Sequence, residues 1–391
     1  MARLAVALLA GVFVIFFALQ VSADPAPDPR PAKCDYSVGK WVKSADKPQR
    51  YSGVGWESNY CKYIRSGFNC ETNNRPDQLY RQLRWQPEKC DLDYVTPEDW
   101  GFLMKGKRML MVGDSITNNA YQSLLCLISS ADNRGKPFDD DSAPKGLKGV
   151  DFPSIDFSLH FYFSPYLTQA ERRKPIVNQT GTPGYKVNIT TIDPVVQFLV
   201  PYYDVVLFST GVWWSQNFPG SPKQPDQYYI QGGLVNITNV NAQWYAVKSW
   251  ANFLTRIEYP GMPYFLSFSP KHGPVNPTDP GEGSCGATRP MQWEEAMDEY
   301  SNLTVAEDYY KSQKNALRGS VFRHVRVTRM SETRPDAHLG MWNQIQPDVS
   351  AAFRTPDKGD CTHWCLPGLP DSWMDMLYTQ MLLEPLLLTP N

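Results

Sequence analysis

Six consecutive residues near the C-terminus, Asp360 to Cys365, combine side chains that suit three kinds of chemistry. The stretch reads Asp-Cys-Thr-His-Trp-Cys, so an acid, a histidine and two cysteines lie close together along the chain. Such a set is compatible with a metal site, with a redox-active cysteine pair, or with the acid and base of a catalytic triad. The remainder of the chain decides among the three.

The metal and redox interpretations are both weak. A zinc site usually takes four ligands, often spaced cysteine pairs with further cysteine or histidine. The other four histidines are scattered along the chain, at His160, His272, His324 and His338. The two cysteines are separated by three residues, whereas disulfide oxidoreductases use a spacing of two. We therefore expect no metal site, and we expect Cys361 and Cys365 to end disulfides.

The triad interpretation requires a serine on a turn elsewhere. At a spacing of three, Asp360 and His363 can share one side of a turn, so the carboxylate holds one ring nitrogen while the other faces a nucleophile. Ser115, in Val-Gly-Asp-Ser, ends an apolar run and begins a helical pattern, which places backbone N–H groups beside its hydroxyl. The Gly-x-Ser-x-Gly elbow of α/β-hydrolases is absent from the chain. Gly-Asp-Ser alone indicates an ordinary helix N-cap, but together with Asp-x-x-His it predicts a triad.

Apolar runs that alternate with helical patterns position these residues. The strand candidates are residues 107–115, 203–211, 263–270 and 321–327, and the helix candidates are 116–130, 241–257 and 372–388. This alternation predicts an α/β fold with a mainly parallel sheet covered on both faces. Residues 131–200 and 273–320 are long and polar, and we expect irregular insertions around the site there.

The N-terminus reads as a targeting segment. Residues 1–23 carry a single charge, Arg3, before an apolar run that is short for a membrane span and typical of a secretory signal, with cleavage expected after Ala23. An uncleaved signal anchor is the competing interpretation, and only then do we expect a membrane contact. A Pro-rich leader (24–33) and a cap with four cysteines (34–105) precede the main domain (106–391).

The composition favours the same compartment. All eight cysteines follow the targeting segment, and an even number favours disulfides in an oxidising lumen. The formal net charge of -2 gives no electrostatic case for nucleic acid or for anionic membranes as partners. Four Asn-x-Ser/Thr sequons are candidate glycosylation sites: Asn178, Asn188, Asn236 and Asn302.

Several motifs together resemble a known family. "GDS" and "DCTHWC" are similar to blocks of the SGNH/GDSL hydrolase superfamily, and the mature chain resembles the plant trichome birefringence-like family within the PC-esterase group. The matching segments are colinear: SGFNC (66–70), NRPD (74–77), RWQPEKCDL (84–92), GKRMLMVGDS (106–115), TGVWW (210–214), RPDAHLGMW (334–342) and DCTHWCLPGLPDSW (360–373). The resemblance implies a three-layer SGNH or flavodoxin-like α/β fold with a disulfide-stapled cap.

The resemblance also implies roles for individual residues. Ser115 would form an acetyl-enzyme, His363 would be the base and Asp360 would fix the imidazole tautomer. The Ser115 backbone N–H, with Gly211 or Asn119, would bind the oxyanion. The candidate substrate contacts are Trp213, Trp214, Arg334, Asp336 and His338. Core packing is the alternative for the two tryptophans, and a structural ion pair is the alternative for the last three residues.

Disulfides and family differences follow from the same resemblance. The implied pairs are Cys34–Cys90, Cys61–Cys126, Cys70–Cys365 and Cys285–Cys361, which would tie the cap to the segment carrying His363. Val212 stands where the family usually has histidine, and Asn118-Asn119-Ala120 stands where Arg-Asn-Gln is common. Both differences bear on substrate choice and on the oxyanion role of this helix, and the triad residues are intact.

The expected function is O-acetyl transfer to hydroxyls of a cell-wall polysaccharide, such as xylan, another hemicellulose or pectin. The co-substrate would be an acetyl donor, acetyl-CoA or another acyl carrier, with no bound cofactor. The expected location is the secretory pathway, in the Golgi lumen or membrane, with secretion to the cell wall as the alternative. A polysaccharide acetylesterase that uses the same triad with water, and a non-catalytic wall-glycan-binding protein, remain as alternative functions.

Overall fold

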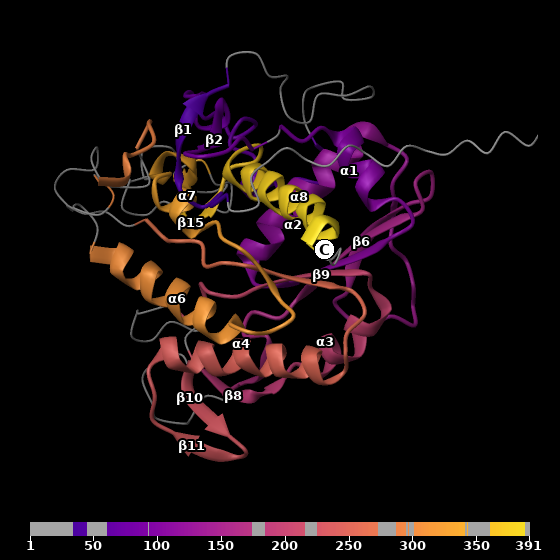
Figure 1. Ribbon diagram of the computed structural model, residues 1–391, viewed down its shortest axis with the longest axis vertical. Helices are drawn as coiled ribbons and strands as arrows, with labels where there is room; N and C mark the ends of the chain where they lie inside the picture. The colour runs from indigo at the N-terminus through magenta and orange to yellow at the C-terminus, as the bar shows by residue number, and fades with distance from the viewer. Residues whose placement is uncertain are drawn as a thin grey trace, which may run out of the picture.

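A seven-stranded sheet, with five parallel strands, forms the centre of the fold. The structure is a computed structural model that describes residues 34–44, 61–92, 94–173, 184–215, 225–272, 287–294, 296, 301–340, 342 and 360–387 (Figure 1). The expected signal segment, the Pro-rich leader and Cys285 lie outside these residues. Among the described residues, no helix is long and apolar enough to cross a membrane.

The strand order places the first parallel strand in the interior of the sheet. From one edge the order is β13 (Arg323–Val325), β12 (Met262–Leu266), β9 (Val205–Ser209), β3 (Arg108–Gly113), β6 (Phe157–Phe163), β5 (Lys148–Phe152) and β4 (Lys136–Pro137). The chain passes from β3 to β6 on one side and then to β9 on the other, which is the flavodoxin-like order. Such a reversal leaves a crevice beyond the carboxyl ends of the strands, where ligands bind.

Helices cover both faces of this sheet, which confirms the predicted three-layer architecture. The first helical layer consists of α1 (Pro97–Met104), α2 (Ser115–Ala131) and α8 (Leu369–Leu387), and the second of α3 (Pro194–Leu199), α4 (Asn239–Arg256) and α6 (Ser301–Leu317) (Figure 1). Along β3, Met109 and Met111 are buried with the first layer, and Leu110 and Val112 with the second. A strand buried on both faces reads as a continuous apolar run, as this one does.

The expectation of irregular insertions is wrong in both polar stretches. Residues 131–200 contain β4 to β8 and α3, and β6 pairs directly with β3. The alternating Phe157, Leu159 and Phe161 of β6 are buried in the same cluster as α2, which is the period-two signal of a strand. Residues 301–317 form α6. In both stretches the average polarity hides the regularly spaced apolar positions.

A smaller four-stranded sheet packs against α4 in the lower part of Figure 1. Its order is β11 (Gly233–Val235), β10 (Pro225–Ile230), β8 (Tyr185–Ile192) and β7 (Thr168–Arg172). Val187 of β8 shares a buried cluster with Ala242 of α4 and with Trp214. The turn that follows β9 is therefore packed between this sheet and α4.

The N-terminal cap contains little regular structure and is attached by disulfides. Its elements are β1 (Gly39–Lys43), which pairs with β2 (Leu83–Pro87), and the short 3-10 helices η1 (Ser66–Phe68) and η2 (Leu79–Arg81). Cys34–Cys90 closes within the cap, Cys61–Cys126 joins the cap to α2, and Cys70–Cys365 joins it to the turn after β15 (Asp360–Trp364). Three of the four predicted pairs are thus present among the described residues, and the fourth involves Cys285, which lies outside them.

Candidate active site

Ser115 lies where the strand order predicts a site. It is the first residue of α2 and follows the carboxyl end of β3 directly. Gly113, two residues earlier, has a φ of 158°, and a Cβ at this position would collide with the carbonyl oxygen of Ser209 and with Thr117 Oγ1. Only glycine fits so close to the end of β9, which explains the glycine of the Gly-Asp-Ser motif.

Asp114 connects this turn to the turn after β9. Its side chain caps α2 by accepting from the Ile116 N–H at 2.9 Å, and its other oxygen accepts from the N–H groups of Gly211 (3.3 Å) and Val212 (3.2 Å). Burial raises the pKa of the Asp114 carboxyl, while the backbone hydrogen bonds and the charge of His363 oppose that rise. Asp114 therefore acts on the position of Ser115 through the backbone.

The structure brings Ser115, His363 and Asp360 together. Ser115 Oγ lies 2.7 Å from His363 Nε2, and His363 Nδ1 lies 2.7 Å from Asp360 Oδ2. The second oxygen of Asp360 accepts from the backbone N–H groups of Thr362 (2.9 Å) and His363 (3.0 Å). Burial raises the pKa of Asp360. The hydrogen bond from His363, the charge of His363 and the two backbone donors together lower it by more, so the pKa of Asp360 lies well below the usual range.

A bulge explains how residues three apart in a strand can meet. In a regular strand, residues at i and i+3 point to opposite faces. β15 pairs with β14 (His338–Gly340), where His338 is opposite Trp364 and Gly340 is opposite Asp360. The four-residue step in β15 therefore matches a two-residue step in β14. This irregularity lets Asp360 and His363 lie on the same side.

Residues distant in the sequence hold His363 in place. The Phe68 ring stacks on the His363 ring, with centroids 5.3 Å apart. Asn119, one turn after Ser115 on α2, binds both backbone groups of Trp364: its Oδ1 accepts from the N–H at 3.0 Å and its Nδ2 donates to the carbonyl at 3.1 Å. The helix that begins with Ser115 and the strand that carries His363 are thereby joined by one buried amide.

Two buried histidines, His272 and His338, lie next to β15, the strand that carries Asp360 and His363. His338 Nδ1–H donates to the His363 carbonyl at 2.9 Å, and the His338 ring stacks on Trp364 at 3.6 Å. His338 Nε2 is 2.7 Å from His272 Nδ1. Burial lowers the pKa of His272 to about 4, and burial together with the neighbouring His272 lowers the pKa of His338 well below its usual range.

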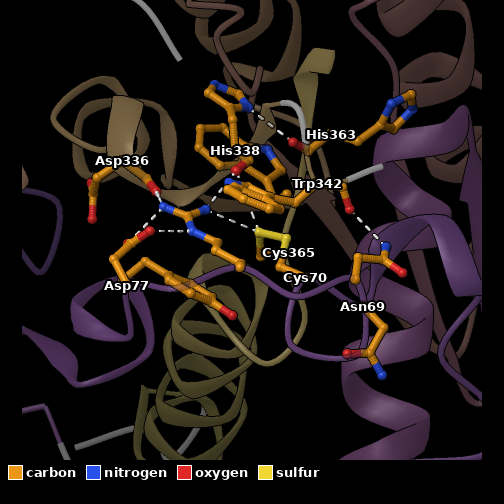
Figure 2. The surroundings of a disulfide bond; sticks show 12 residues. Asn69, Cys70, Asp77, Asp336, His338, Trp342, His363 and Cys365 are labelled. Carbon is orange, nitrogen blue, oxygen red and sulfur yellow. Dashed lines mark hydrogen bonds and ion pairs between the residues drawn. A yellow bond between two sulfur atoms is a disulfide. The ribbon is translucent and has the colours of Figure 1, made fainter. Parts of the chain in front are cut away.

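Arg75 and a disulfide connect the cap to this strand pair. Figure 2 shows the disulfide between Cys70 and Cys365 with Asp77, Asp336 and His338 around it. The Arg75 guanidinium donates to the carbonyls of His338 (2.8 Å) and Asp336 (2.6 Å), and it forms a two-bond ion pair with Asp77. The disulfide of Cys70 with Cys365 lies beside it. The cap therefore fixes both β14 and the end of β15.

The predicted oxyanion donors need correction. The Asn119 amide is fully buried and is used on both sides by Trp364, and the Gly211 N–H donates to Asp114. Neither group is free to face an oxyanion, so both are positioning groups in this geometry. The backbone N–H of Ser115 remains as a donor, because the first N–H groups of a helix have no acceptor within the helix.

Most of the predicted substrate contacts are buried, which also corrects the prediction. Trp214 is fully buried and donates from its ring N–H to Thr210 Oγ1 at 2.7 Å. Arg334 and Asp336 form a buried two-bond ion pair, at 2.8 and 3.0 Å, and Arg334 also donates to the carbonyl of Tyr80 in the cap. His338 supports β15 from behind. These residues are structural.

Trp213 differs from its neighbour Trp214 because it is only partly buried. Its ring contacts that of Phe163 at 5.6 Å, and the Phe163 side chain is 44% exposed. It follows directly after Val212, whose N–H binds the Asp114 carboxylate next to Ser115. Among the five predicted substrate contacts, only Trp213 is partly exposed, and it lies on the turn next to Ser115.

The remaining predictions concern cysteines and glycosylation. Cys361 is disulfide-bonded, and its predicted partner Cys285 lies outside the described residues. Asn236 is exposed just after β11, whereas Asn188 is partly buried in β8. Asn178 lies outside the described residues, and Asn302 belongs to α6. Among the described residues, no three His, Cys, Asp or Glu side chains are grouped so as to hold a metal ion.

The sequence motifs indicate the reacting groups but not the contacts that position them. Phe68, Arg75 and Asp114 all lie within the motifs shared with the family, but no local pattern indicates what their side chains contact. His272 lies in no such motif and carried no signal in the sequence beyond being one of five histidines.

Comparison with known proteins places the chain in a family. The profile of the family described as PC-Esterase, "GDSL/SGNH-like Acyl-Esterase family found in Pmr5 and Cas1p", matches residues 101–380, and the PMR5 N terminal domain matches residues 32–91. A solved structure of a GDSL-like lipase from Parabacteroides merdae aligns with 71% of this chain and 95% of its own chain, at 10% identity and a TM-score of 0.31.

Curated plant proteins match over nearly the whole chain. Protein trichome birefringence-like 43 of Arabidopsis thaliana is 30% identical over 89% of this chain and 88% of its own length. Protein trichome birefringence-like 9 of the same plant is 28% identical (90% and 84%), and Xylan O-acetyltransferase 3 of Oryza sativa is 26% identical (93% and 79%). This chain belongs to the PC-Esterase family, as a relative of the trichome birefringence-like proteins.

Proposed function

We propose that this protein is a polysaccharide O-acetyltransferase in which Ser115, His363 and Asp360 form the catalytic triad. The observation that carries the proposal is the unbroken chain of two 2.7 Å contacts from the Ser115 hydroxyl through the imidazole to the Asp360 carboxylate. Relatives named xylan O-acetyltransferase support transfer to a glycan rather than to water.

The first half-reaction acetylates the serine. His363 Nε2 removes the proton from Ser115 Oγ, and Oγ attacks the carbonyl carbon of the acetyl donor. The tetrahedral oxyanion lies near the Ser115 N–H, at the N-terminus of α2, where the helix dipole also favours negative charge. When the bond between the carbonyl carbon and the donor atom breaks, the imidazolium returns its proton to the donor, which leaves as the free carrier.

The second half-reaction transfers the acetyl group to the acceptor. His363 Nε2 now removes a proton from a sugar hydroxyl, whose oxygen attacks the acetyl-serine carbonyl. The bond to Ser115 Oγ breaks and the serine regains its proton from the imidazolium. The low pKa of Asp360 keeps it ionised through both steps, so it holds Nδ1–H and stabilises each imidazolium without taking the proton.

Selection of a sugar over water depends on the surface beside Ser115. The exposed part of Trp213 and the neighbouring Phe163 offer ring faces on the turn that Asp114 ties to the nucleophile. We place the acceptor sugar there, where it would displace water from the acetyl-serine. The N-terminal segment supports a lumenal location in the secretory pathway. An oxidising lumen allows disulfides to form, and a polysaccharide acceptor is compatible with the same compartment.

Product analysis tests the proposal directly. The purified protein is incubated with acetyl-CoA, or with acetylated p-nitrophenol as a generic donor, and with xylan, mannan, xyloglucan or pectin oligosaccharides. Mass spectrometry and NMR should find an acetyl ester on a sugar hydroxyl, and Ser115→Ala should give none. Release of acetate with no acetylated glycan under every donor and acceptor would identify an esterase instead. Glycan binding without an acetyl-Ser115 adduct would identify a non-catalytic binding protein.

A further inference from the structure

A cavity lies between the cap and the main domain. It has a volume of about 220 Å³ and is lined by β1 and β2 of the cap, by residues 290–294, and by α7 (Thr328–Glu332) with Thr333. A single water occupies roughly 30 Å³ of liquid, so the space suits a ring-sized ligand. Ser115, Asp360 and His363 are not among the lining residues. The cavity is therefore separate from the candidate active site.

Three tryptophans line this cavity: Trp41, Trp85 and Trp293. The Trp41 ring N–H donates to the Met330 carbonyl (3.1 Å) and Thr333 Oγ1 (3.0 Å), and the Trp85 ring N–H donates to the Tyr36 carbonyl (2.8 Å). The rings of Trp41 and Trp85 also meet edge to face at 5.4 Å. Since both N–H groups already have acceptors, these two rings are held in place. Trp85 is buried and the Arg334 guanidinium lies 4.3 Å from the Trp41 ring centroid, so these rings offer a ligand only the carbon surface that remains uncovered.

Polar groups stand beside the aromatic surfaces. The Arg329 guanidinium lies over the Trp293 ring, 5.1 Å from its centroid, and its Nε is buried without a hydrogen-bond partner among the described residues. Arg329 also lines the cavity, so the other N–H groups of its guanidinium are the donors that it offers to a ligand hydroxyl oxygen.

The charges around the cavity are balanced. Lys40 and Arg329 contribute positive charge, and Glu88 and Glu294 contribute negative charge, with Lys40, Glu88 and Glu294 all exposed. Such a lining gives no net attraction for an anionic or a cationic ligand. Rigid aromatic faces combined with both donors and acceptors match a neutral polyhydroxylated ring, which has apolar C–H faces and hydroxyls around its edge.

We propose that this cavity binds a neutral sugar residue of the polysaccharide acceptor, at a distance from the residue that is acetylated. The assignment of a sugar rests partly on the proposed function, which supplies a long glycan as the acceptor. Once a glycan is bound at one of the two sites, its binding at the second site is effectively intramolecular, so two sites favour polymers over short oligosaccharides. The cap would then have two roles: it would bind the substrate, and it would hold β15 in position.

Binding by a catalytically silent protein tests this without any turnover. The full chain carrying Ser115→Ala is titrated by calorimetry with xylohexaose, mannohexaose and cellohexaose, and with a galacturonic acid hexamer as an anionic comparison. Trp293→Ala in this background should weaken binding of at least one neutral hexaose by roughly tenfold, as expected for loss of one aromatic contact. Trp293→Phe should restore most of the affinity. Thermal melting checks that each variant is folded.

The matched control is Trp244→Ala, which removes a partly buried tryptophan of α4 that does not line the cavity. It should bind as the parent does. The proposal is overturned if Trp293→Ala binds as tightly as the parent, if no neutral hexaose binds, or if only the anionic hexamer binds. Because none of these measurements uses acetyl transfer, failure of the proposed enzymatic activity would be seen separately, in the wild-type product assay.

Discussion

The two halves of the candidate active site are held in opposite ways. Ser115 follows a buried strand of the central sheet and begins a helix that its neighbour Asp114 caps, and Asp114 also binds the turn after β9. His363 lies on a short bulged strand and is positioned by contacts with residues from 25 to 295 positions away in the sequence. The nucleophile is placed by regular elements of the central sheet, and the base is placed mainly by side chains from distant segments.

This difference has a physical consequence. β3 and α2 keep their geometry as long as the central sheet is folded, because each is held by many backbone hydrogen bonds and core contacts, and the loss of one contact changes little. β15 has one short partner strand, so its geometry depends on a few contacts to Phe68, Asn119 and His338. Changes remote from the chemistry should therefore disturb His363 far more than Ser115.

The largest expected effect comes from the reacting groups, which should be equally necessary although they are held differently. Ser115→Ala and His363→Ala should each lower kcat by at least about 10³-fold, and the double variant should be no worse than either, because triad members act as one unit. Ser115→Ala should leave the melting temperature unchanged, while His363→Ala loses its contact with Phe68. Steady-state kinetics and thermal melting measure both, and a variant that keeps a tenth of the rate would contradict the triad.

The next effect concerns the disulfide on the base side. Replacing Cys70 and Cys365 together by serine should lower stability by about 2–5 kcal/mol and should also lower kcat, because the end of β15 is released. The matched control replaces Cys34 and Cys90, which close a separation of 56 residues within the cap rather than 295. That pair should affect stability but leave kcat near the parent value. Equal losses of kcat in both pairs would remove the distinction between the two halves.

A smaller effect is expected at Asn119, which joins the halves. Asn119→Ala leaves two buried backbone groups of Trp364 without partners, at a cost of about 1–3 kcal/mol each in stability. We expect kcat to fall by roughly tenfold, whereas loss of a true oxyanion donor costs about 10²–10³-fold without a loss of stability. Asn118→Ala is the control, since Asn118 accepts from Lys148 and does not contact β15. Kinetics and denaturant unfolding on both variants separate the two roles.

The same contrast explains how much the sequence reveals. The strand before Ser115 and the helix after it are visible because continuous apolar residues and helical spacing are local signals. The spacing of Asp360 and His363, together with the family resemblance, identified both residues, but nothing local indicates the bulge that lets them meet. β6 was missed because His160, although buried, makes the run look polar.

Burial of polar and aromatic residues was the least predictable property. Arg334 looks like a groove residue by type, yet it is 1% exposed because its charge is matched by Asp336 and a further N–H donates to a carbonyl 254 residues away. Trp213 and Trp214 are adjacent in the sequence, but only one keeps exposed surface. Such differences depend on which distant segments cover a residue, and a single sequence does not encode that in any local pattern.

The last expected effect is on stability as a function of pH, and it again concerns the base side. Glu332, whose backbone carbonyl accepts from His272, has its pKa raised to about 8 by burial and by the nearby Glu307, against the opposing charge of Arg329. Between pH 4.5 and pH 8 the unfolded carboxyl is ionised while the folded one keeps its proton, so the contribution of Glu332 to stability should fall as the pH rises through this window.

Glu332→Gln should remove this contribution while keeping the shape of the side chain. Relative to the Gln variant, the unfolding free energy of the parent should decrease by a few kcal/mol from pH 5 to pH 8, at about 1.4 kcal/mol for each unit between the two pKa values. The comparison isolates Glu332, because the buried His272 and His338, whose pKa values are lowered, add the opposite slope to both proteins. The control Glu171→Gln changes an exposed carboxyl on β7 and should keep the parent's slope. A variant with the parent's slope would show that Glu332 is ionised in the folded protein, and the buried side of β14 and β15 would then carry a charge that this geometry leaves unpaired.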